Sequence, residues 1–182
     1  MKKFQIVALA TTLLLAFSFV SCAKEDVKRE GVTTYEQYAA LDLDSAVVVE
    51  TYVQAKQSWW EDKATLYTQD YDGAYFIYNV ACSKDDYEKL VPGTKIRVTG
   101  YKAEWAGEVE IVDGTLEILD GKYIAKPLDV TKMLGTEELI NYQNQFVSFK
   151  GMTVEDSGDK NAFLYKWNGS GVEGDDLYFN VS

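Results

Sequence analysis

The order of the strand-forming segments in the middle of the chain constrains the fold most. Three runs rich in β-branched and aromatic residues come first: "SAVVVETYVQAK" (45–56), "ATLYTQ" (64–69) and "AYFIYNV" (74–80). Between the second and third runs, "DYDG" is typical of a tight hairpin, because Gly73 tolerates a positive φ. "SKDDYEKL" predicts one short helix with Ser83 as its N-cap. "TKIRVTGYKAEW" and "EVEIVDGTLEIL" predict two further strands, so we expect an all-β domain.

This order of three strands, a helix and two strands resembles the OB-fold, a five-stranded Greek-key barrel with its helix between strands three and four. The stretch "LVPGTKIRVTGYKAEWAGEVEIVDG" is similar to half of the OB domains in bacterial extracellular lipoproteins and secreted nucleases. The likeness includes the spacing of Gly93, Gly100 and Gly107. It covers residues 45–119 and implies an OB-fold domain there.

The first 21 residues are typical of a targeting segment. Lys2 and Lys3 precede an apolar run over residues 6–20, which is too short to span a membrane comfortably. The run ends in "FVSC", and Ser21 directly before Cys22 resembles the lipobox of bacterial lipoproteins. The resemblance implies that Cys22 carries lipid and anchors the protein to a bacterial membrane, facing the periplasm or the exterior. The alternative is an ordinary signal peptide followed by a chance cysteine.

The charge and the residue types exclude several functions. Without Lys2 and Lys3, 16 basic residues face 29 acidic ones, which gives a net charge of −13. Phosphate backbones are bound by clusters of Lys and Arg, so we do not expect a nucleic-acid partner. The chain has no histidine, which removes histidine-based catalysis and histidine metal sites. We expect no enzyme activity, no cofactor and no metal, and we expect Cys82 to be a buried thiol.

Part of the hairpin sequence returns near the C-terminus. "ATLY" at 64–67 matches "AFLY" at 162–165 with an offset of 98, and "NV" recurs at 79–80 and 180–181. We therefore predict a tether at 22–44, the OB domain at 45–119, a connector with a helical turn at 120–144, and a second OB-like unit at 145–182. The alternative is a chance likeness between hairpins rich in Tyr and Val. The second unit would lack its helix and last two strands, so we expect a fragment of a longer protein, or completion by another chain.

Aromatic residues indicate where a ligand would bind. OB-folds bind ligands on the outer face of strands two and three, between the loops that follow strands one and four. Alternation predicts that Tyr75 and Ile77 share one face of the third strand, whereas Phe76 and Tyr78 share the other. With Leu66 placed inside, the predicted ligand-binding residues are Trp59, Trp60, Tyr67, Tyr75 and Trp105. Such aromatic platforms stack bases or sugar rings, and the negative charge favours a glycan or a protein partner. The alternative is that the tryptophans close the barrel ends or pack against the second unit.

Together these features predict an extracytoplasmic lipoprotein that acts as a non-catalytic binding or scaffolding module through OB-fold units. An alternative is the N-terminal accessory OB region of a longer secreted hydrolase such as a nuclease. A structural spacer is a third possibility, and it predicts buried tryptophans.

Overall fold

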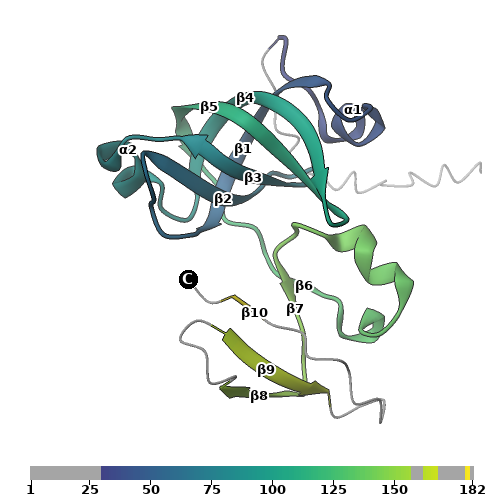
Figure 1. Cartoon of the computed structure of the whole chain (residues 1–182). Helices are drawn as coiled ribbons and strands as arrows, with labels where there is room; N and C mark the ends of the chain where they lie inside the picture. The colour runs from purple at the N-terminus through teal and green to yellow at the C-terminus, as the bar shows by residue number, and fades with distance from the viewer. Residues whose placement is uncertain (1–29, 157–161, 168–178, 181–182) are drawn as a thin grey trace, which may run out of the picture.

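The computed structural model describes residues 30–156, 162–167 and 179–180, with side chains up to residue 152. Five strands close into a barrel in the order β1-β2-β3-β5-β4, in the upper half of Figure 1. They are β1 (Ala46–Lys56), β2 (Lys63–Gln69), β3 (Ala74–Ala81), β4 (Thr94–Trp105) and β5 (Glu108–Lys122). Only the β3–β5 contact within the barrel is parallel. The predicted all-β class and the five-stranded barrel are confirmed.

The helix between the third and fourth strands is also confirmed. It is α2 (Lys84–Lys89), and the Ser83 side chain accepts a hydrogen bond from the backbone N–H of Asp86 at 3.1 Å. Asp85 and Asp86 lie in the first turn and Lys89 in the last, which complements the helix dipole at both ends. Leu90, directly after the helix, is fully buried in the core.

The barrel interior is filled by one cluster of apolar side chains. Alternate residues of β1 and β4 supply valines and an isoleucine, as the period-two pattern predicts. Cys82 is a free, buried thiol, and burial raises its pKa, as expected for a structural cysteine. The fully enclosed members of the cluster are Val49, Val53, Leu66, Tyr75, Ile77, Val80, Leu90, Ile96, Val98 and Ile111.

The predicted outward position of Tyr75 is wrong. Tyr75 and Ile77 are both fully buried, whereas Tyr78 is exposed. The reason is the hairpin register, because Thr68 pairs with Tyr75 and cross-strand partners share a face. At Asn79 the backbone takes a positive φ of 49°, and this local irregularity returns Val80 to the interior.

The predicted tether at 22–44 is corrected where the structure describes it, from residue 30 onward. Helix α1 (Tyr35–Ala40) begins with a capping box, in which Thr34 and Gln37 exchange side chain–backbone hydrogen bonds. Tyr38 is 4% exposed, and its ring meets that of Tyr75 edge-on at 5.1 Å. The charged segment before the helix suggested a solvated linker. The capping residues and the buried tyrosine make 34–41 part of the barrel domain instead.

The connector returns the chain beside the barrel. Two short parallel strands, β6 (Leu128–Asp129) and β7 (Val147–Ser148), enclose the 3₁₀ helices η1 (Thr131–Met133) and η2 (Glu137–Tyr142). The helical turn predicted in this part of the connector is therefore confirmed. None of the helices in the described ranges is long and apolar enough to cross a bilayer.

The last described strands form a separate sheet, in the lower part of Figure 1. They are β8 (Met152–Asp156), β9 (Ala162–Trp167) and β10 (Phe179–Asn180), and their order is β10-β9-β8. Moved back by the repeat offset of 98, β9 falls at 64–69, inside β2. A three-stranded antiparallel arrangement is thus present where the second unit is predicted. The repeat itself stays a prediction.

Candidate functional site

A row of aromatic rings lies on the outer face of β2 and β3. Tyr67 and Phe76 are cross-strand partners, with ring centroids 5.0 Å apart, and Phe76 lies 6.3 Å from Tyr78. Tyr67 is half-buried, Phe76 is 6% exposed and Tyr78 is 45% exposed. The rings support one another, so the row is a firm surface with its open side at Tyr78.

A cavity of about 240 Å³ lies at the open side of this row. It is lined by Phe76, Tyr78, Trp105, Glu108 and Glu110. Trp105 ends β4 and is 74% exposed. The two residues that follow it, Ala106 and Gly107, have φ values of 51° and 88°. Positive φ at both central residues is typical of a tight two-residue hairpin turn that matches the twist of its strands. Because Trp105 pairs with Glu108 across this turn, the indole is held by a short, regular hairpin.

A second cavity, of about 640 Å³, continues from the first and shares Tyr78 and Glu110 with it. The continuation runs over β3 and β5, where the parallel register passes from Ile77 opposite Ile111 directly to Ala81 opposite Thr115. Asn79 and Asp113 lie within this interval, and both have positive φ, 49° and 50°. The ladder is therefore interrupted under the cavity. The two cavities together are called the outer groove below.

The far end of the outer groove is formed by the loop between β1 and β2. Glu61 and Asp62 of this loop line the second cavity, and both have positive φ. Trp60, next to them, is 70% exposed. Trp59 is anchored differently, because its indole N–H donates to the backbone carbonyl of Cys82 at 3.0 Å. Trp59 therefore fastens the loop to the barrel, and Trp60 is left at the surface.

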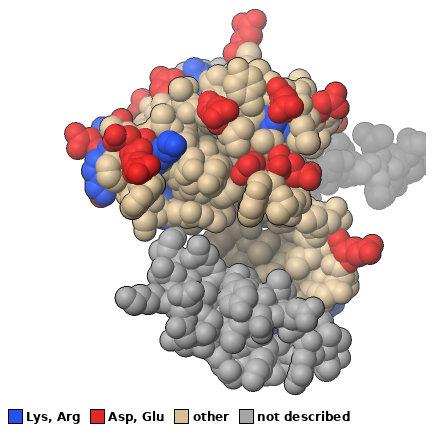
Figure 2. All heavy atoms as spheres, viewed as in Figure 1, with Lys and Arg blue, Asp and Glu red and all other residues tan. Residues whose placement is uncertain are grey.

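The groove is electrostatically negative. Burial raises the pKa of the Glu108 carboxyl, and the carboxylate of Glu110 raises it further. Burial also raises the pKa of Glu110, which is only 9% exposed. Within the described part of the chain, neither carboxylate forms an ion pair or a hydrogen bond. Figure 2 shows acidic side chains spread over the face of the barrel, with few basic ones among them.

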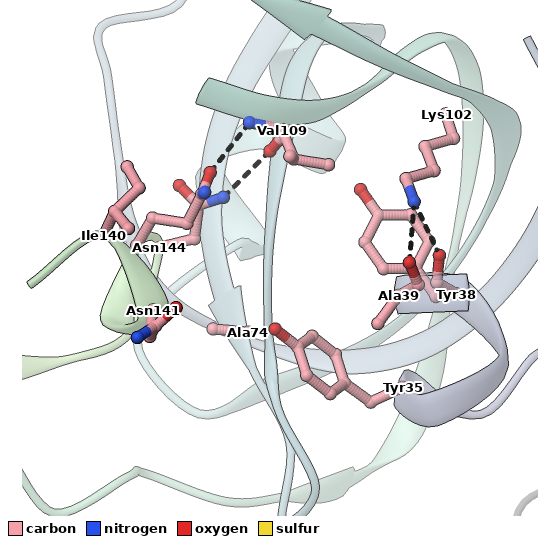
Figure 3. Close-up of a pocket in the computed structure, with 10 residues that line it drawn as sticks. Tyr35, Tyr38, Ala39, Ala74, Lys102, Val109, Ile140, Asn141 and Asn144 are labelled. Atoms are coloured by element: carbon pink, nitrogen blue, oxygen red, sulfur yellow. Dashed lines mark hydrogen bonds between the residues drawn. The ribbon is translucent and has the colours of Figure 1, made fainter. Parts of the chain in front are cut away.

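A third cavity, of about 320 Å³, lies between α1, the β4–β5 hairpin and η2 (Figure 3). Several of its polar groups are already used by the fold. The Lys102 ammonium donates to the carbonyls of Tyr38, Ala39 and Leu41 at 3.0, 3.1 and 2.6 Å, and so closes the C-terminal end of α1. On the connector side, Gln143 and Asn144 bond the backbone N–H and carbonyl of Val109 at 2.8 and 2.9 Å.

No protein family matches the chain, and no curated protein or solved structure is significantly similar to it. Among the described residues, no group of three carboxylate or cysteine side chains is arranged to hold a metal ion.

The structure brings together only part of the predicted aromatic set. Trp105 lines the groove, Trp60 lies beside it, and Tyr67 supports its aromatic row. Trp59 is half-buried and holds the loop, and Tyr75 belongs to the core. Among the residues that line the first cavity of the groove, sequence reasoning missed four, namely Phe76, Tyr78, Glu108 and Glu110. The hairpin could have identified the first two. With Leu66 inside, a tight turn after Gln69 pairs Leu66 with Ile77 and leaves Phe76 and Tyr78 outside.

Proposed function

We propose that this protein is a lipid-anchored extracytoplasmic binding module, and that the outer groove of its barrel holds the ligand. The observation that carries the proposal is the combination, in one continuous groove, of an exposed indole, an aromatic row and two carboxylates that have no partner among the described residues. Groups of these types, when they converge in a groove and are not used by the fold, are what a recognition site requires.

The barrel supports an assignment to the OB-fold. Its strand order, its parallel β3–β5 contact and the position of α2 between β3 and β4 agree with that topology. The groove also lies between the two connections that OB-folds use, since Trp60 comes from the β1–β2 loop and Trp105 borders the β4–β5 turn. On the same basis, we propose that the sheet β8–β10 begins a second OB-like unit.

The anchor is proposed from sequence alone, because Cys22 lies outside the described residues. Only 12 residues, 23–34, separate Cys22 from the first residue of α1, so a lipid on Cys22 would hold the barrel near the membrane surface. A fully extended chain of that length spans at most about 40 Å. The outer groove would then face ligands in the envelope or at the cell exterior.

The proposed ligand is a glycan or a protein. Exposed indole and phenol rings can stack on sugar faces or pack against side chains. The acidic groove opposes nucleic acid, because its carboxylates would repel the phosphates. If the ligand is a protein, the same groove would serve to scaffold a larger assembly.

The groove is tested by screening the full chain, purified in detergent micelles, against arrays of glycans and of peptides. We expect Trp105→Ala to weaken binding of the recovered ligand about tenfold, because it removes an exposed stacking surface without touching the core. Leu43→Ala is the matched control, since Leu43 is 51% exposed and lines neither groove cavity. Equal binding by wild type and both variants would place the site elsewhere and remove the proposal.

The anchor is tested separately with Cys22→Ser. We expect this change to abolish incorporation of labelled fatty acid and to move the protein from the membrane fraction to the soluble one. Cys82 remains in the variant and serves as the internal control for labelling of other thiols. Unchanged labelling would mean that Cys22 is not the lipidated residue. Protease treatment of intact cells then distinguishes exterior from periplasmic exposure.

A further inference from the structure

The chemistry of the groove limits which ligand it can take. Glu108 and Glu110 project from the same face of β5, two residues apart, and lie in one cavity with Trp105. Their raised pKa values show that the folded protein pays a free-energy penalty for keeping both ionised. A neutral ligand would bury these carboxylates further without compensating their charge, whereas a cation would remove the repulsion between them.

The aromatic side of the same cavity also suits a cation. Trp105 is 74% exposed and Tyr78 is 45% exposed, so both can present ring faces to a ligand. Ammonium and guanidinium groups are attracted to the faces of Trp and Tyr, most strongly to Trp. The cavity volume of about 240 Å³ is sufficient for the end of one long side chain.

The second cavity extends this preference along the barrel. Its lining includes Glu61, Asp62 and Asp113, as well as Glu110, against one basic residue, Lys63. The two cavities share Tyr78 and Glu110 and are lined by residues along β3 and β5, so together they form an elongated channel. A ligand that fills both cavities is therefore extended and carries more than one positive charge.

We infer that the outer groove binds an extended basic segment of a partner protein, with one Lys or Arg side chain inserted between Trp105, Glu108 and Glu110. This inference rests on the proposed function and specifies the ligand class within it. The acidic lining favours a basic peptide over a neutral sugar chain, and the elongated shape favours an extended ligand.

The test is calorimetric titration of the full chain in detergent micelles at low salt. The probe is a blocked nine-residue peptide of alternating Lys and Ser, and the comparison peptide has Glu in place of every Lys. We expect the Lys peptide to bind and the Glu peptide not to bind. Replacing both groove carboxylates, Glu108→Gln with Glu110→Gln, should weaken binding of the Lys peptide at least about tenfold. Trp105→Ala should weaken it about fivefold.

The matched control separates a site from general attraction to an acidic protein. Glu137→Gln with Glu138→Gln removes the same charge from exposed positions in η2 and should change affinity less than about twofold. An equal loss in both double variants would overturn the inference, because it would show non-specific attraction. Circular dichroism of each variant checks that the barrel is folded.

A neutral oligosaccharide, cellohexaose, and a cationic one, chitohexaose freed of its acetyl groups, complete the experiment. Binding of cellohexaose but not of the Lys peptide, with loss in Trp105→Ala, would overturn this inference and keep the proposed function. Tighter binding of the cationic sugar than of the peptide would overturn the assignment to a protein segment. If no probe binds, this inference fails. The proposed function is then decided separately by the glycan and peptide arrays.

Discussion

The β4–β5 hairpin has two faces, and they differ in how their polar groups are used. On one face, Lys102 and the backbone of Val109 border the cavity under α1, and each of their hydrogen-bonding groups there has a partner in α1 or the connector. On the other face, the carboxylates of Glu108 and Glu110 have no such partner among the described residues. Two cavities a few residues apart are therefore different in kind. The first is a junction of the fold that these hydrogen bonds hold together, and the second contains two carboxylates without a partner among the described residues.

The largest expected effect is on the junction face. Tyr38→Ala removes a ring that packs on the core and meets Tyr75 edge-on. We expect the free energy of unfolding to fall by about 3 kcal/mol, as for other buried aromatic truncations. Urea denaturation followed by circular dichroism measures it. A loss below about 1 kcal/mol would mean that α1 contributes little to the stability of the barrel. Residues 34–41 would then behave as part of the predicted tether.

Lys102→Met should have the next largest effect. The change keeps the aliphatic stem and removes the ammonium that three carbonyls of α1 share. We expect a loss of about 2 kcal/mol, because charge-assisted hydrogen bonds are lost and the carbonyls keep only poorer partners. Amide hydrogen exchange should show faster opening at 35–41 than at β1. Uniformly unchanged protection would contradict the capping role.

Gln143→Ala tests the connector side of the junction. It removes one hydrogen bond, to the backbone N–H of Val109. We expect a loss of about 1 kcal/mol, with no change in affinity for the groove ligand. The same urea and titration measurements report both values. A marked change in affinity would show that the two faces of the hairpin are coupled and do not act independently.

The smallest effect is expected on the groove face, and it has the opposite sign. A raised pKa in the folded protein means that ionisation of Glu108 destabilises the fold. The contribution is favourable at low pH and is lost as pH rises through the raised pKa. Glu108→Gln should therefore stabilise the protein at pH 7, by less than about 0.5 kcal/mol, and the gain should vanish at the lowest pH at which the chain stays folded. A loss of stability at pH 7 would indicate a protein partner for this carboxylate.

Most elements of the barrel could be predicted from the sequence, whereas the site could be predicted only in outline. The strands, the capped helix α2 and the turn at "DYDG" follow from local signals, and the structure places them where they were expected. Helix α1 was missed although Thr34 and Gln37 form a capping box, because the charges before it dominated the interpretation. Trp105, one of the predicted ligand-binding residues, lines the groove, but Tyr75 was predicted at the surface and Tyr78 was not.

The sequence by itself determined which segments become strands, helix and turns, because alternation, capping residues and glycine positions act over a few neighbouring residues. It also determined the acidic net charge and the high content of tyrosine and tryptophan. Only the tertiary structure decided that Val80 returns to the interior of the barrel, since that depends on the backbone irregularity at Asn79. It alone brought Trp105 and Glu108 of one hairpin against Phe76 and Tyr78 of β3, because the closure of the barrel pairs β3 with β5.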